Sequence, residues 1–156
     1  MTHLKSLLIV ANQPSANTKR LAEVTATGAR HPDIDSVHVI VREPLQAHAD
    51  DVLNCHGIII GTTENFGYMS GLIKDFFERI YYPCLEKTEA LPYALYVRAG
   101  NDGQGTRNAV QRIVTGLCWS EAQPCLILKG DYQTSFETQC EELGATMAMG
   151  MEAGIY

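Results

Sequence analysis

Residues suited to binding an anion gather in the segment 12–18 of this 156-residue chain. The segment is rich in hydroxyl and amide side chains and opens directly into a helical pattern. Unpaired N–H groups and the dipole at the start of a helix attract phosphate. Because the segment holds no Lys or Arg, Ser15, Asn17 and Thr18 would bind phosphate through dipoles and not through a fixed charge. Simple helix capping by Ser15 or Asn17 is the alternative, since such residues cap many helices.

Two further segments, 62–68 and 98–105, also follow apolar runs. The second contains Gly100, Gly103 and Gly105, which would let the backbone approach a flat ligand closely, although glycines are also common turn formers. It lacks the Gly-Lys-Ser/Thr signature of a nucleotide-binding P-loop. We therefore do not expect ATP or GTP hydrolysis.

Catalytic side chains and metal ligands are not indicated. Ser15 has no His nearby and no Gly-x-Ser-x-Gly around it. The five cysteines are scattered without a Cys-x-x-Cys pair, and the five histidines are dispersed. This usage predicts reduced thiols in a cytoplasmic protein, with no disulfide framework and no metal site. The strand ends that would need acidic residues in a magnesium-dependent phospho-acceptor carry Ala11-Asn12 and Gly61-Thr62 instead.

The elements that must position these segments alternate along the chain. Apolar runs predict five strands, at 4–11, 37–41, 57–61, 93–98 and 125–129. Helical spacing predicts five helices, at 17–29, 45–55, 70–82, 106–117 and 136–147, with Thr106 as an N-cap. Alternation of this kind predicts one α/β domain over 1–156, with a parallel sheet between two helical layers.

The strand order 2-1-3-4-5 fits five such strands and has its switch point between the first and third. Ligands bind there, outside the carboxyl ends of the strands, where the three segments above end. Pro124 favours an edge position for the fifth strand, because proline cannot donate to the ladder.

Composition limits the partners. A net charge of −6 argues against nucleic acid, because no excess positive charge is available to release counterions. The longest apolar run, Leu7–Ala11, is too short for membrane insertion or for the core of a signal peptide. We expect a small-molecule partner.

A family resemblance rests mainly on residues 61–76, whose sequence is Gly-Thr-Thr-Glu-Asn-Phe-Gly-Tyr-Met-Ser-Gly-Leu-Ile-Lys-Asp-Phe. This run resembles the G-T-P-T-x-F-G-x-M-x-G-x-x-K-x-F segment of flavodoxin-like NAD(P)H-dependent quinone and FMN reductases. The S-x-N-T-x-x-L-A run at 15–22 is similar to the FMN-phosphate loop of that family. The resemblance implies a flavodoxin-like three-layer α/β sandwich.

The resemblance also implies how FMN would be held. Ser15, Asn17 and Thr18 would bind its phosphate. The ring would lie between the other two segments, against Thr62, Thr63, Glu64, Asn65, Phe66, Gly67, Arg98, Ala99, Gly100, Asn101 and Gly105. Thr63 and Glu64 depart from the Pro-Thr of the family. A carboxylate facing the ring would disfavour the reduced flavin anion, so Glu64 is expected to point to solvent or to alter the flavin site.

The implied activity is an NAD(P)H-dependent oxidoreductase, with NAD(P)H as co-substrate. Hydride would pass through FMN to a quinone, a flavin or a similar small acceptor, and the flavin would supply the chemistry. Backbone N–H groups, aided by Arg98, would stabilise the reduced anion, unless Arg98 is simply a strand-end residue that reaches solvent. A homodimer is expected, for which the apolar helix 70–82 offers a surface.

Two alternatives stay open. The first is a flavodoxin-type electron carrier between protein partners, and the second is a flavodoxin-like domain that has lost FMN. Carriers usually cover the ring with an aromatic residue after the fourth strand, whereas the segment 98–105 has none. Phe66 and Tyr68 could shield one face of the ring or belong to the core.

Overall fold

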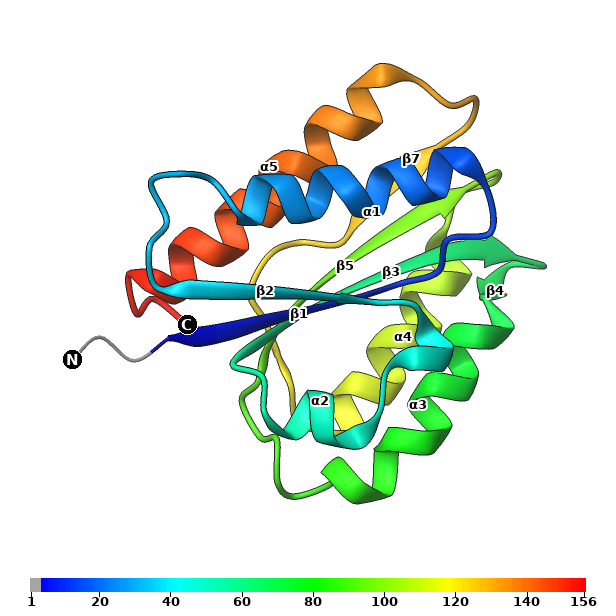
Figure 1. Cartoon of the computed structure of the whole chain (residues 1–156). Coiled ribbons are helices and arrows are strands. Elements are labelled where there is room, and N and C mark those ends of the chain that lie inside the picture. The colour runs from blue at the N-terminus through cyan, green and yellow to red at the C-terminus, as the bar shows by residue number, and fades with distance from the viewer. Residues whose placement is uncertain (1–3) are drawn as a thin grey trace.

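A parallel sheet forms the middle layer of the structure, a computed structural model that describes residues 4–156 (Figure 1). The strands lie in the order β2-β1-β3-β5, and the last two strands of the chain, β6 and β7, both pair with β5. The parallel strands are β1 (Lys5–Ala11), β2 (Val37–Arg42), β3 (Gly57–Asn65), β5 (Pro92–Ala99), β6 (Ser120–Glu121) and β7 (Leu126–Lys129). The short strand β4 (Tyr68–Met69) turns back antiparallel on the end of β3.

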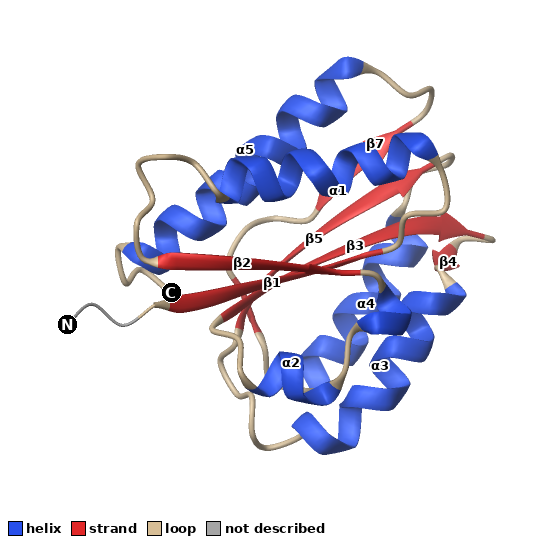
Figure 2. Ribbon diagram, in the orientation of Figure 1, coloured by secondary structure: helices blue, strands red, loops and turns tan. Residues whose placement is uncertain are grey.

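Helices cover both faces of the sheet (Figure 2). One layer holds α1 (Ala16–Ala29) and α5 (Thr134–Glu152). The other holds α2 (Ala49–Leu53), α3 (Gly71–Cys84) and α4 (Gln104–Gly116). Among the helices of residues 4–156, none combines the length and the apolar content needed to cross a bilayer.

The apolar patterns explain this layering. Leu7–Ala11 is completely buried because β1 has covered neighbours on both sides and helices on both faces. On α3, Ile73, Phe76, Phe77 and Ile80 form one buried stripe against the sheet. A separate core cluster lies under α1 and α5. The predicted flavodoxin-like α/β class and strand order are confirmed at this level.

The strand position next to β5 is divided between two short strands, β6 and β7, which the sequence did not predict. Glu121 pairs with Tyr93 and Leu126 pairs with Tyr96, so four residues on one side face two on the other. Pro124 lies in this interruption, where no ladder hydrogen bond is required of it. The resumed strand β7 has β5 as its only strand partner within residues 4–156, so the predicted edge position is confirmed.

Several predicted element boundaries were wrong, including that of the last helix, which spans Thr134–Glu152 and not 136–147. The helix expected at 45–55 is a 3₁₀ turn over Pro44–Gln46 followed by the five-residue α2, because Pro44 starts the turn and the chain then extends at Ala47. The third strand was expected to end at residue 61 but continues to Asn65. Its last residues pair with β4, which has only two residues and is therefore too short to show a strand pattern in the sequence.

The two described ends of the chain lie at the same side of the sheet, at the left of Figure 1. Lys5 at the start of β1 and Tyr156 at the end of the chain line one cavity there. The carboxyl ends of β1, β3 and β5 lie at the opposite edge, beside β4.

Candidate functional site

The three segments singled out in the sequence meet at the carboxyl edge of the sheet. The Asn12 N–H donates to the Gly61 carbonyl at 2.9 Å, and the Asn12 side-chain amide donates to Thr63 Oγ1 at 3.3 Å. These bonds tie the loop after β1 to the end of β3. Asn12 was not among the predicted site residues, although its place directly after a buried strand was a usable signal.

Ser15 is the N-cap of α1. Its Oγ accepts from the Thr18 N–H at 3.2 Å, and Thr18 Oγ1 accepts from the Ser15 N–H at 2.9 Å, which makes a reciprocal capping box. The capping alternative therefore holds for Ser15. Thr18 is buried and its hydroxyl is bonded to the Ser15 backbone within the cap, whereas Asn17 is exposed.

The start of α1 still offers an anion site. The N–H groups of Ala16 and Asn17 have no partner within the helix, because no turn precedes them. The first turn carries no acidic side chain, so nothing in it repels an anion. The structure thus leaves this site with two backbone donors, the dipole and the Asn17 amide.

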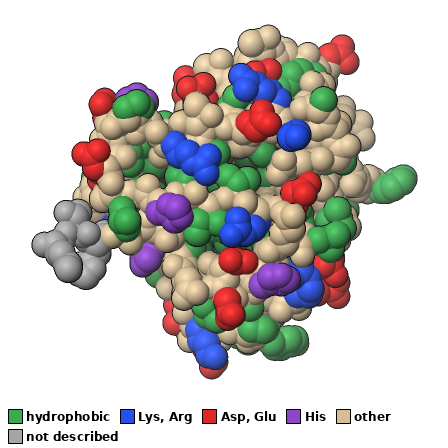
Figure 3. All heavy atoms as spheres, viewed as in Figure 1, with side chains coloured by type: hydrophobic (Ala, Val, Ile, Leu, Met, Phe, Trp, Pro, Cys, Tyr) green, Lys and Arg blue, Asp and Glu red, His purple; other side chains and the backbone are tan. Residues whose placement is uncertain are grey.

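The hairpin between β3 and β4 presents two exposed aromatic residues. Its two-residue turn has Phe66 at φ 54° and Gly67 at φ 73°, the positive values that a type I′ turn requires. Phe66 is fully exposed and Tyr68 is 43 % exposed, so the alternative in which they belong to the core is wrong. In Figure 3 a hydrophobic side chain stands out from the right-hand edge, on the side where β3 and β4 end. A left-handed backbone is rare for phenylalanine, and such strain collects at functional sites.

Glu64 joins this hairpin to the loop after β5. Its Oε1 accepts from the Asn101 N–H at 2.7 Å and its Oε2 accepts from the Gly103 N–H at 2.8 Å. Of the two alternatives expected for Glu64, the one in which it points to solvent is therefore wrong. The physical reason is that Gly103, at φ 69°, precedes α4 and leaves backbone donors that a carboxylate can satisfy.

Contacts at the start of α4 tighten the same junction. Thr106 Oγ1 donates to the Tyr68 carbonyl at 2.9 Å. A Cβ on Gly105 would overlap the Gly67 carbonyl oxygen, so only glycine fits there. The prediction of Thr106 as N-cap was wrong, because α4 begins earlier, after Gly103, and Thr106 bonds to the hairpin instead.

Thr62 has a structural role at this edge. Its buried Oγ1 accepts from the Ser70 N–H at 3.1 Å, and Ser70 caps α3 by accepting from the Ile73 N–H at 3.1 Å. Thr62 therefore orients the start of α3. Ser70 was missed as part of the site because its contribution depends on this long-range bond.

Arg98 lies on the α5 side of the sheet. Its Nη1 donates to the carbonyls of Ala99 and Leu128, both at 3.0 Å, and its guanidinium carbon lies 5.1 Å from the centre of the Phe136 ring. These contacts hold the guanidinium between the sheet and α5. Neighbouring Ala99 is buried, whereas Gly100 faces open space.

The cysteines offer no reactive thiolate at the site. All five are unpaired, as the sequence predicts. Burial raises the pKa of the Cys55 and Cys140 thiols to about 12, so both stay protonated at neutral pH.

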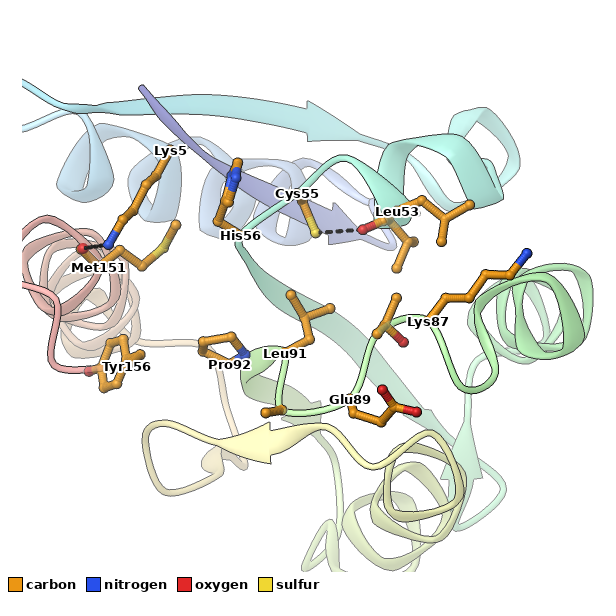
Figure 4. A pocket seen from close by; sticks show the side chains of 13 residues that line it. Lys5, Leu53, Cys55, His56, Lys87, Glu89, Leu91, Pro92, Met151 and Tyr156 are labelled. Atoms are coloured by element: carbon orange, nitrogen blue, oxygen red, sulfur yellow. Dashed lines mark hydrogen bonds between the residues drawn. The ribbon is translucent and has the colours of Figure 1, made fainter. Parts of the chain in front are cut away.

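A cavity of about 460 Å³ lies at the opposite edge of the sheet, where the strands begin (Figure 4). Its lining includes Cys55, His56 and Tyr156, and Lys5 Nζ donates to the Met151 carbonyl at 2.6 Å beside it. None of the predicted site residues is among the residues that line it. Size alone therefore does not locate the candidate site.

Comparison with known proteins extends these observations. No protein-family model matches the chain. A curated flavodoxin from Aquifex aeolicus (strain VF5) is 27 % identical over 111 residues, which cover 71 % of this chain and 59 % of that protein. A solved flavodoxin from the domain Archaea superposes with a TM-score of 0.80 at 17 % identity, covering 94 % of this chain and 99 % of its own. The fold is flavodoxin-like.

The flavodoxin-like fold also occurs inside larger proteins. The rubredoxin oxygen:oxidoreductase from Desulfovibrio gigas matches with a TM-score of 0.78 at 13 % identity, over 99 % of this chain but 38 % of its own length. A flavodoxin from Streptococcus pneumoniae TIGR4 matches with a TM-score of 0.76 at 17 % identity, over 92 % of this chain and 98 % of its own. In this fold the switch point lies between β1 and β3, which is where the three loops meet.

Proposed function

We propose that the chain binds FMN at these three loops and acts as a flavodoxin-type electron carrier between protein partners. The observation that carries the proposal is the direct connection, through Asn12, of an anion-ready helix start to a hairpin with an exposed aromatic tip. A phosphate and a flat ring on one ligand match these two features. The flavodoxin relatives support the same assignment.

For the phosphate, the donors would be the N–H groups of Ala16 and Asn17, together with the Asn17 side chain. The exposed Ser15 hydroxyl, whose oxygen already serves the cap, would stand at the rim. This arrangement suits a phosphate held by dipoles, without a lysine or arginine in the loop.

For the ring, Phe66 would stack on one face, and Gly100 would allow close approach of the backbone. Glu64 would shape the ring site without facing it, because both of its oxygens accept backbone N–H groups. When bound, FMN supplies the redox chemistry, and the protein sets its position and electrostatic surroundings.

An NAD(P)H-dependent reductase that passes hydride to a quinone or a similar small acceptor is the second candidate. The loop 99–105 contains no aromatic residue, so one face of the ring would stay open for a nicotinamide. The expected homodimer, with α3 as its surface, belongs to this candidate.

The deciding experiment is an anaerobic absorption titration of the purified protein with FMN, followed by NADPH and NADH. If the chain is a carrier, bound flavin gives absorption bands at about 370 and 450 nm. Neither nicotinamide bleaches these bands, whereas a one-electron donor bleaches them. Bleaching by a nicotinamide within seconds would establish the reductase instead. Absence of flavin binding throughout the titration would contradict both candidates and leave a flavodoxin-like domain without FMN.

A further inference from the structure

A groove runs between α3 and α4, starting beside the candidate site. It consists of an upper hollow of about 410 Å³, next to the candidate site, and a lower hollow of about 260 Å³ beside Tyr81 and Tyr82. Lys74 and Ile113 line both hollows. Tyr68 and Gly105 line the upper hollow, and both also belong to the hairpin junction described above. A molecule seated in the groove would therefore lie against the loops that form the candidate site.

The lower hollow combines apolar and aromatic side chains with one ion pair, and it is lined by Phe77, Tyr81, Tyr82, Ile113, Lys74 and Glu78. Tyr82 is 80 % exposed, and its ring packs edge-on against Tyr81 with 5.4 Å between centres. A Cβ on Gly116 would overlap the Tyr81 hydroxyl, so this glycine lets Tyr81 lie directly on α4. The exposed aromatic end resembles the anchoring pockets that bind an apolar side chain of a partner.

The upper hollow of the groove is basic in a chain that is acidic as a whole. Across both hollows the lining cations are Lys74 and Arg112, and Glu78 in the lower hollow pairs with Lys74 at 3.7 Å. By contrast, α5 carries four glutamates and no lysine or arginine, and the net charge of the chain is −6. Lys74 and Arg112 line the upper hollow, and its lining, taken over residues 4–156, includes no acidic residue.

We propose that this groove docks an acidic, apolar-anchored helical segment of a redox partner protein. The inference rests on the proposed function, electron transfer between proteins, and assigns the surface where a partner would sit. Opposite charge on the partner follows from the cations of the upper hollow, of which Arg112 has no ion-pair partner within residues 4–156 whereas Lys74 pairs with Glu78. An apolar anchor follows from Tyr82 and Ile113. A second copy fits less well, because a two-fold contact places the same cations on both sides.

The test uses a defined pair of peptides. The first is a 16-residue helical peptide with leucines at i, i+3, i+4 and i+7 and glutamates at the exposed positions, and its twin carries lysines in place of the glutamates. Each is titrated into the ¹⁵N-labelled, FMN-free chain while amide chemical shifts are recorded. We expect the acidic peptide to shift amides along the groove, including those of Ile113 and Tyr82, and the basic twin to shift none of them.

A matched pair of variants locates the binding. Arg112→Glu is expected to weaken acidic-peptide binding by about fivefold to tenfold, an effect of the size that losing one ion pair and adding repulsion produces. Lys87→Glu makes the same charge change at the opposite edge of the sheet and is expected to change binding less than about twofold.

Several results would overturn the proposal. These are equal binding of both peptides, shifts confined to other surfaces, and concentration-dependent dimers in sedimentation that Arg112→Glu disrupts. Because the peptides are titrated into the FMN-free chain, a failed FMN titration counts against the proposed function alone. Failed peptide binding with successful FMN binding counts against the groove alone.

Discussion

At the scale of single residues, Glu64 determines how the loop after β5 is held. Both oxygens of its carboxylate accept backbone N–H groups, and a bond to a charged acceptor is stronger than one between neutral groups. The sequence motif placed Glu64 at the ring but could not reveal its partners, because they lie 37 and 39 residues further along the chain.

Replacing Glu64 with alanine leaves the Asn101 and Gly103 N–H groups without this acceptor. We expect Glu64→Ala to lower the free energy of unfolding by about 1–3 kcal/mol. We expect Glu64→Gln to lose less, because the amide keeps one acceptor oxygen. Urea denaturation measures the stability, and amide hydrogen exchange at residues 101 and 103 measures the local effect. Wild-type protection of these two amides in Glu64→Ala would show that the carboxylate does not hold the loop.

Asn17 offers a test of the phosphate site that leaves the fold intact. In Asn17→Asp, the new carboxylate at the start of α1 interacts favourably with the helix dipole but repels a bound phosphate. We expect about tenfold weaker FMN binding, which corresponds to about 1.4 kcal/mol, with no loss of thermal stability. Flavin fluorescence titration measures the affinity. Gln139→Glu, the same charge change on the exposed side of α5, is the control, and equal affinities in the two variants would place the phosphate elsewhere.

At the scale of elements, α1 and α5 pack closely because two glycines meet the facing backbone. A Cβ on Gly28 would overlap the Glu141 carbonyl oxygen, and one on Gly144 would overlap that of Thr25. Arg20 and Glu137 form an ion pair at 3.0 Å across the same two helices. The α1–α5 layer therefore has little room to adjust.

Gly144→Ala is expected to destabilise the chain by about 2–3 kcal/mol, because the added methyl group forces two backbones apart. Gly71→Ala serves as the control, since a Cβ there meets nothing within 4 Å. We expect the control to be neutral or slightly stabilising. Chemical denaturation of both variants decides between them, and equal stability would show that the two helices can separate at no cost.

The Glu137 contacts predict a dependence on pH. The Arg20 guanidinium, and after it the Tyr132 hydroxyl at 3.0 Å, lowers the pKa of the Glu137 carboxyl. A lowered pKa stabilises the fold at pH values above the unfolded value of about 4.3, and the contribution disappears as pH falls through the folded value. Wild type should therefore melt above Glu137→Gln at pH 7, and the difference should shrink towards pH 3. A difference that is constant from pH 7 to pH 3 would contradict this assignment.

Helices and strands could be predicted where the hydrophobic periodicity extends over many residues. The predictions failed where an element depends on a short local pairing. The apolar runs of β1 and β3 and the stripe on α3 identified the sheet and its layers without tertiary information. The β3–β4 hairpin and the short strand β6 each depend on a pairing of two residues, which is too short to leave a hydrophobic pattern in the sequence. At the site, the sequence located the three loops but not the bonds that join them, because those bonds link distant segments.

At the scale of the whole molecule, a ligand that binds only the folded chain must stabilise all of it. FMN at about one hundred times its Kd is expected to raise the free energy of unfolding by about 2.7 kcal/mol. Thermal melts with and without FMN measure the effect, and its removal by dialysis should return the melting temperature to the starting value. Identical melting temperatures at saturating FMN would contradict binding to the native state.

The placement of both described chain ends away from the three loops has a practical consequence. Lys5 and Tyr156 lie together at the amino edge of the sheet, and the exposed Phe66 lies at the other. A surface or a fused protein attached through either end would leave the carboxyl edge facing outward. If every molecule were tethered to an electrode in this way, each would present the same face to a soluble partner, and voltammetry would test the proposed redox exchange directly.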